Sequence, residues 1–158
     1  MKEQGIGLVE AIVVISIATA AFASLLSAAV FFLRGGLESA DRAQALYLLD
    51  EGAEAVRFLR DQGYTLNITP RIDAGDFYLS PSTAGLEATS TPVVDLGAYT
   101  RTLTLEEVYR RVSDSDIVPS TSGDPKAIDP NTALLSVTVS WGGGEVETQT
   151  YITNLYDN

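Results

Sequence analysis

An uninterrupted apolar run, Ala11–Leu33, decides the fold of this chain; it reads AIVVISIATAAFASLLSAAVFFL and contains no charged residue. A helix over these positions is about 34 Å long at roughly 1.5 Å per residue, which is enough to cross a hydrocarbon core of about 30 Å. A carboxylate, Glu10, directly precedes the run. An unpaired acid drawn to the bilayer centre costs about 2.5–3.5 kcal/mol. We therefore predict a membrane-spanning helix and treat Glu10 as a functional residue that needs a partner.

The residues that flank the run indicate which kind of signal it belongs to. A secretory signal peptide places small residues at a cleavage site after its apolar segment, but Phe31, Phe32 and Leu33 occupy those positions here. Cleavage before the run would instead keep the span in the mature chain. The segment from Gly5 to Glu10, GIGLVE, resembles the class III signal of the type IV pilin superfamily.

The resemblance implies a processing and assembly pathway. A prepilin peptidase would remove residues 1–5 by cutting after Gly5, and Ile6 would become the N-methylated first residue of the mature chain. Glu10 would be the fifth mature residue and would pair with the N-terminal amine of a neighbouring subunit. Ile6 and Gly7 differ from the usual phenylalanine and threonine, and neither difference removes a group that this chemistry needs.

The resemblance also implies partners and a location. They are other pilins in a homo- or hetero-oligomeric filament, the prepilin peptidase, an inner-membrane assembly platform and membrane lipid. The precursor would cross the cytoplasmic membrane once, and the assembled subunit would lie in a surface pilus (fimbrium) or a periplasmic pseudopilus. The loop over 64–100 and the absence of cysteine favour a minor pilin or a type II secretion pseudopilin over a major pilin, although all three stay open, as do adhesion target and cargo. The alternative is a single-pass anchored surface binding domain that does not polymerise.

Composition excludes several functional classes. The chain has a net charge of −11 and a pI near 4.2, so we expect no nucleic-acid partner, since such binding depends on phosphate neutralisation. Without cysteine it can form no disulfide, and without histidine it has no His-activated nucleophile, His-metal site or histidine pH switch. No catalytic constellation stands out, so we expect no enzyme activity, no catalytic residue and no cofactor.

The helix is expected to continue beyond the membrane. Residues 6–34 would form the membrane or filament-core half and residues 35–63 an amphipathic half, with Gly63 as the stop. The stripe predicted to face the core consists of Leu46, Leu49, Ala53 and Val56. Gly35 and Gly36 lie at the junction, where two glycines cost about 1 kcal/mol each, and we predict a hinge there at which the helix bends or melts.

Residues 64–158 are predicted to form a globular β domain, with an irregular loop over 64–100 that contains several prolines and glycines. Period-two alternation follows from Arg101, at Leu103, Leu105 and Tyr109. It recurs at Leu135, Val137, Val139 and Trp141 before a glycine turn (142–144) and a partner strand (146–155). The predicted fold class is α+β: a long N-terminal helix packed on a small antiparallel meander, as in pilins.

The remaining candidates are charged side chains on loops and strands. Asp114, Asp116, Asp124 and Asp129 share a proline-rich loop (114–131), but their order does not match an EF-hand, so we favour a solvated acidic loop over a calcium site and predict no metal. We predict that Arg101, Arg110 and Arg111 face solvent and that Tyr109 and Trp141 belong to the core.

Overall fold

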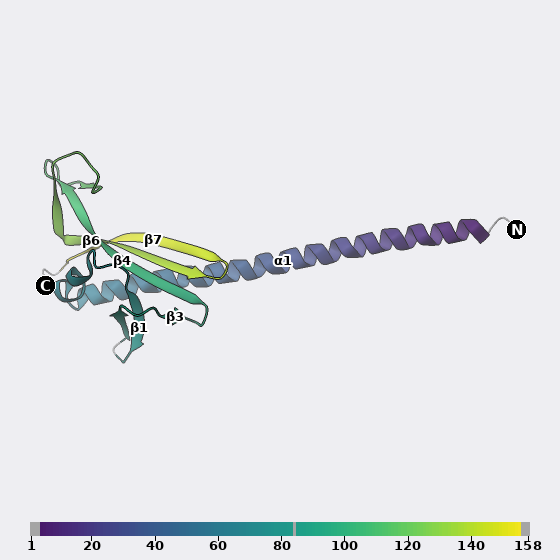
Figure 1. Ribbon diagram of the computed structural model, residues 1–158, viewed down its shortest axis with the longest axis horizontal. Helices are drawn as coiled ribbons and strands as arrows, with labels where there is room; N and C mark the ends of the chain where they lie inside the picture. The colour runs from purple at the N-terminus through teal and green to yellow at the C-terminus, as the bar shows by residue number, and fades with distance from the viewer. Residues whose placement is uncertain (1–3, 84, 156–158) are drawn as a thin grey trace. The chain divides into compact units, whose positions relative to one another are not determined.

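Helix α1 (Gln4–Asp61) begins the computed structural model, which describes residues 4–83 and 85–155 (Figure 1). The chain divides into two compact units, residues 1–41 and 42–158. In the first unit, every residue from Gln4 to Asp41 is helical. The second unit contains the rest of α1 and all the strands. One stretch of α1 is long and apolar enough to cross a membrane, as the composition predicts.

The second unit is built on antiparallel strands, which confirms the α+β class. Two short helical turns follow α1: α2 (Tyr64–Asn67) and η1 (Thr69–Arg71). The strands are β1 (Tyr78–Ser82), β2 (Gly85–Thr89), β3 (Val94–Asp95), β4 (Tyr99–Arg111), β5 (Ile117–Val118), β6 (Lys126–Trp141) and β7 (Gly144–Thr153). The main sheet has the order β3-β4-β6-β7, with β5 added to β4, while β1 and β2 form a separate two-stranded sheet.

The core lies between the main sheet and the C-terminal part of α1. Alternation works as predicted on β4 and β6, because Leu103, Leu105, Leu135, Val137 and Val139 are all fully buried on one face. The helix contributes a stripe in which Ala45, Leu49, Ala53, Val56 and Leu59 recur at intervals of three and four residues, and Leu48 and Ala55 widen it.

The predicted helix stripe was wrong at one position. Leu49, Ala53 and Val56 are buried, but Leu46 is 47% exposed. The buried series starts one residue earlier, at Ala45. A shift of one residue rotates a side chain by about 100° around the helix axis, so Leu46 leaves the buried face.

A bulge interrupts the alternation on β4. Glu107 pairs with Ala133 and Tyr109 pairs with Ile128, so one residue of β4 is matched by residues 129–132 of β6. Bulges of this kind re-aim the side chains that follow them. Val108 is therefore buried and Tyr109 only half-buried, which contradicts the prediction that Tyr109 continues the core series. Trp141 does pack against the core, with its ring 6.2 Å from that of Tyr99.

Both predicted loops contain regular structure. Residues 64–100 include α2, η1, the β1–β2 hairpin and β3. Pro81 is tolerated in β1 because both strands of this two-stranded sheet are edge strands. The second loop is shorter than expected, because β6 starts at Lys126 and Pro130 falls within the bulge. Gly142 and Gly143 form the predicted turn between β6 and β7.

Beyond the bulge, β4 and β6 extend past the last residue of β7 that pairs with β6, and they carry the connecting loop with them. We call residues 108–131 the distal arm; it is green in Figure 1. Its strands pair as Tyr109–Arg111 with Lys126–Ile128, and β5 adds to the other edge of β4. Val112 and Ile128 of the arm are exposed, so the main core does not hold it in place.

Alanine substitutions of two leucines test which face of α1 packs against the core. In the chain lacking residues 1–33, Leu49→Ala should lower the free energy of unfolding by about 2–5 kcal/mol because it opens a cavity in the core. Leu46→Ala, the matched control on the exposed face, should cost less than about 0.5 kcal/mol. Urea denaturation followed by circular dichroism measures both, and equal losses would contradict the assigned face.

Candidate functional site

The predicted processing site lies at the start of α1. Residues 1–3 of the leader lie outside the described residues, while the backbone of Gly5 and Ile6 is helical and their side chains are not described. Glu10 follows in the same helix and is exposed. Within the described part of the chain, the Glu10 carboxylate makes no ion pair or hydrogen bond.

The helix around Glu10 exposes apolar side chains on all sides. Every residue from Gly7 to Ala43 is exposed. The large apolar ones include Leu8, Val9, Ile12, Val13, Val14, Ile15, Ile17, Phe22, Leu25, Leu26, Val30, Phe31, Phe32, Leu33 and Leu37. A helix that is apolar all round is stable only where lipid or protein covers it.

The polar groups inside this apolar run are satisfied by the helix itself. The hydroxyls of Ser16, Thr19, Ser24 and Ser27 donate to the carbonyls of Ile12, Ile15, Ala20 and Ala23, one turn earlier, at 2.7–2.9 Å. These four are the hydroxyl-bearing residues of the run. Glu10 is therefore the polar group at this end of the helix that needs a partner from elsewhere.

The predicted hinge is helical at both glycines. Gly35 and Gly36 lie within α1, so the helix does not melt there, and a Cβ added to either would meet no atom within 4 Å. A bend at this point stays a prediction. Nothing inside the described chain requires glycine at these two positions, although alanine would favour the helix more.

A buried guanidinium joins three elements of the second unit. Arg101 on β4 is only 2% exposed, and its Nη1 donates to the Leu48 carbonyl at 3.1 Å and to Glu51 at 2.9 Å. Its Nη2 lies 3.3 Å from Asp95 of β3. Burial raises the pKa of Asp95, and the Arg101 charge partly offsets that effect. The prediction that Arg101 faces solvent was wrong.

A glycine on the helix makes room for this side chain. A Cβ on Gly52 would lie 3.0 Å from Arg101 Cδ and 3.0 Å from Val137 Cγ1. The sequence does carry a signal for this arrangement, namely whether a residue number on the strand is odd or even. Arg101, Leu103 and Leu105 are all odd-numbered. Side chains two residues apart on a strand point to the same face of the sheet, so Arg101 faces the core as the two leucines do.

The acidic loop is bound by the two arginines of the distal arm. Arg111 pairs with Asp114 at 2.7 Å and Asp124 at 2.9 Å, and Arg110 pairs with Asp129 at 2.6 Å. These aspartates serve as arginine partners, and no cluster suited to a metal ion occurs among the described residues. Burial alone would raise the pKa of Asp129, but hydrogen bonds from Arg110, Thr132 and the Asn131 backbone outweigh it and lower the pKa.

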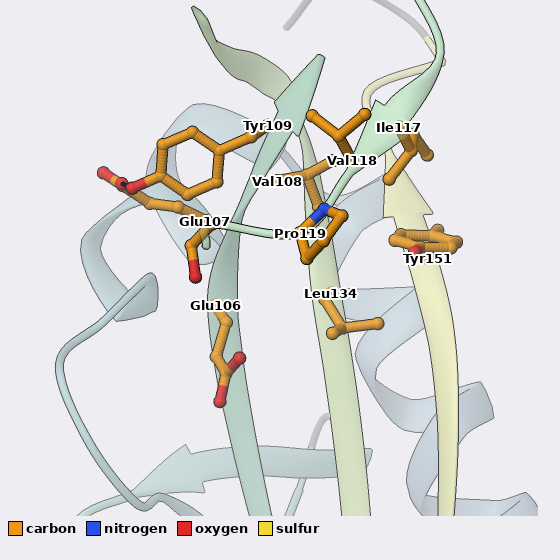
Figure 2. Close-up of a pocket in the computed structure, with 10 residues that line it drawn as sticks. Glu106, Glu107, Val108, Tyr109, Ile117, Val118, Pro119, Leu134 and Tyr151 are labelled. Atoms are coloured by element: carbon orange, nitrogen blue, oxygen red, sulfur yellow. Dashed lines mark hydrogen bonds between the residues drawn. The ribbon is translucent and has the colours of Figure 1, made fainter. Parts of the chain in front are cut away.

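A groove of about 360 Å³ lies on the outer face of the main sheet, away from the core (Figure 2). Glu106, Leu134 and Tyr151 form one cross-strand row on this face, because Glu106 pairs with Leu134 and Leu134 with Tyr151. Figure 2 shows Glu106 and Glu107 to the left of Pro119, Tyr151 to its right and Leu134 below it. We call this the outer groove.

The two glutamates of the outer groove differ in their bonding. Glu107 accepts a hydrogen bond from the Tyr109 hydroxyl at 2.8 Å, and this bond raises the pKa of the Tyr109 phenol. The carboxylate of Glu106 is exposed, and no described residue bonds to it. Tyr151 lies two strands away on β7, with Leu134 between it and Glu106, and is 49% exposed. Periodicity in the sequence does not indicate this groove, because the groove depends on the bulge and on strand pairing between distant residues.

Comparisons with protein families, with curated proteins and with solved structures found no match to this chain.

A double-mutant cycle tests the contact between the helix and β4. In the chain lacking residues 1–33, Gly52→Ala should lower the free energy of unfolding by about 1–2 kcal/mol, because overpacking outweighs the gain in helix propensity. In a Val137→Ala background the same change should cost much less, since one of the two close contacts is gone. Urea denaturation of the four proteins measures this coupling, and an equal cost in both backgrounds would contradict it.

Proposed function

We propose that this chain is a structural subunit of a type IV pilus-like filament, made as a membrane-inserted precursor and assembled through its N-terminal helix. The observation that carries the proposal is the unpartnered Glu10 at the start of an exposed apolar helix. A solitary anchor has no use for this acid, whereas a subunit cleaved after Gly5 would present an N-terminal amine to the Glu10 of its neighbour.

The energetics favour pairing once the helices leave lipid. Opposite charges about 4 Å apart attract by about 4 kcal/mol at an effective dielectric constant of 20. That attraction offsets the desolvation of Glu10 and fixes the register between helices that apolar packing alone would leave free to slide. Small side chains in the run allow the close approach that such packing needs: Ala18, Ala20, Ala21, Ala23, Ala28 and Ala29.

The fold supports the proposal at a coarser level. A long N-terminal helix whose C-terminal part packs on an antiparallel sheet is the architecture that the pilin resemblance implies. Residues 42–61 of α1 bury their apolar stripe against the sheet, while residues 7–41 have no such partner within their own unit. This division suits a subunit that uses one part of the helix for folding and the other for assembly.

Sequencing the N-terminus of the protein in purified surface fibres tests processing. The mature chain should begin at Ile6 and carry an N-methyl group, detectable by mass spectrometry of the N-terminal peptide. A chain that begins at Met1, or at residue 34 or beyond, would contradict cleavage after Gly5.

Neutralising Glu10 distinguishes a filament subunit from a lone membrane anchor. Glu10→Gln should leave membrane insertion and cleavage intact but reduce fibre yield at least tenfold, because the amine of the next subunit loses its counter-ion. Glu38→Gln, an exposed glutamate on the same helix, is the matched control and should assemble normally. Fibre yield by shearing and immunoblotting measures both. A lone anchor would form no fibres in the wild type, and undiminished fibres with Glu10→Gln would remove the role of Glu10.

A further inference from the structure

Charged side chains of both signs lack a partner within the described chain: several carboxylates, among them Glu10 and Glu106, and two arginines. Of the described lysines and arginines, Arg57, Arg60, Arg71, Arg101, Arg110, Arg111 and Lys126 each donate to an oxygen. Arg34 and Arg42, both on α1, do not. Glu38 lies four residues from each in the sequence, but no ion pair joins it to either arginine. Of the two, Arg34 is the one that directly follows the exposed apolar run.

The surroundings of Arg34 suit contact with another surface. Phe31, Phe32 and Leu33 precede it and are exposed. Gly35 and Gly36 follow it, and no side chain covers the helix backbone there. Glycine in an element interior often marks a site where another backbone approaches closely. The cation thus lies between an apolar patch and a gap in the side-chain surface.

The outer groove has the complementary chemistry. Glu106 offers an unpartnered carboxylate, and the exposed Tyr151 ring lies in the same cross-strand row. Leu134 and Pro119 supply apolar walls (Figure 2). An arginine fits such a groove, because its aliphatic stem packs on apolar atoms such as those of Leu134 and Pro119 while its planar head binds the carboxylate of Glu106.

Three further grooves in the described chain offer less to a cation. The one beside Ile128 contains Glu107 and Asp129, which already bond to Tyr109 and Arg110. The one between α1 and β3 contains Glu51 and Asp95, but Arg101 already lies in it and pairs with both carboxylates. The one beside η1 contains Asp76, but it also contains Arg71, which lies over the Phe77 ring at 6.0 Å and whose positive charge repels a second cation. The outer groove therefore combines an unpaired acid, an exposed ring and free volume.

We propose that the outer groove of one copy binds Arg34 of a second copy, with Gly35 and Gly36 allowing the two surfaces to approach. This contact rests on the proposed filament and specifies how the globular part of one subunit meets the helix of another. It gives the glycine pair a role in close approach rather than in bending.

Charge reversal in the full-length chain tests the contact. Arg34→Glu and Glu106→Arg should each lower fibre yield at least tenfold, and the double variant should recover at least half of the wild-type yield. Arg42→Glu is the matched control, because Arg42 is an exposed arginine eight residues further along the same helix, and it should keep at least half of the yield. Immunoblots of membranes establish that each variant is present and processed.

Cysteine cross-linking gives a second readout that does not depend on yield. The chain has no cysteine, so only introduced pairs can form a disulfide. When Gly35→Cys and Ser120→Cys are placed on two differently tagged copies, oxidation should link the tags. Gly35→Cys with Glu145→Cys, at the opposite end of the outer face, should link at least tenfold less.

The outcomes separate the contact from the filament. If both single charge-reversal variants give the wild-type fibre yield, or if the double variant yields no more fibre than either single one, the contact is overturned. The filament proposal is unaffected by either result. Equal cross-linking of the two cysteine pairs would overturn the contact too, as would a defect in Arg42→Glu equal to that in Arg34→Glu. A wild-type chain that forms no fibres would overturn the filament itself.

Discussion

The second unit depends on one constraint: the Arg101 guanidinium must be enclosed in the core with its charge satisfied. It reaches the helix carbonyl of Leu48, the carboxylate of Glu51 and that of Asp95, so α1, β3 and β4 are held together by a single side chain. Leaving a buried charge without partners costs about 3–5 kcal/mol. The position of β3 and the glycine at position 52 both follow from this requirement.

Charge also organises the distal arm, where the apolar core ends. Val108 and Val118 are buried apart from the main core, and Arg110 and Arg111 draw in the aspartates of the loop. These ion pairs are partly exposed, and such pairs contribute about 0–1 kcal/mol each. We infer that the arm is less stable than the sheet it extends, since it has few buried apolar contacts.

Periodicity alone predicted the helix, the two long strands and the glycine turn, because each is a local pattern that one buried face imposes. The alternation at Leu103, Leu105, Leu135, Val137 and Val139 needed no knowledge of the partner strand. What could not be predicted depends on pairing between distant residues. The bulge that moves Tyr109 out of the core and the register that aligns Glu106 with Tyr151 through Leu134 are of this kind.

The candidate sites also divide into those that a local sequence pattern indicates and those that depend on pairing between distant residues. Glu10 could be found because a lone acid beside an apolar run is conspicuous in the sequence itself. Arg101 was misjudged because the overall negative charge of the chain outweighed the parity of its position on the strand. The outer groove requires residues from β4, β5, β6 and β7, and no single segment indicates it.

The hydroxyls of the apolar run bear on how easily this helix could change its surroundings. Each one is bonded to a carbonyl of its own helix. Either lipid or a neighbouring helix would therefore cover residues 11–33 without any hydrogen bond being broken or remade. Transfer between the two environments is governed by shape and dispersion forces alone, so that, Glu10 apart, a helix of this composition exchanges one apolar solvent for another reversibly.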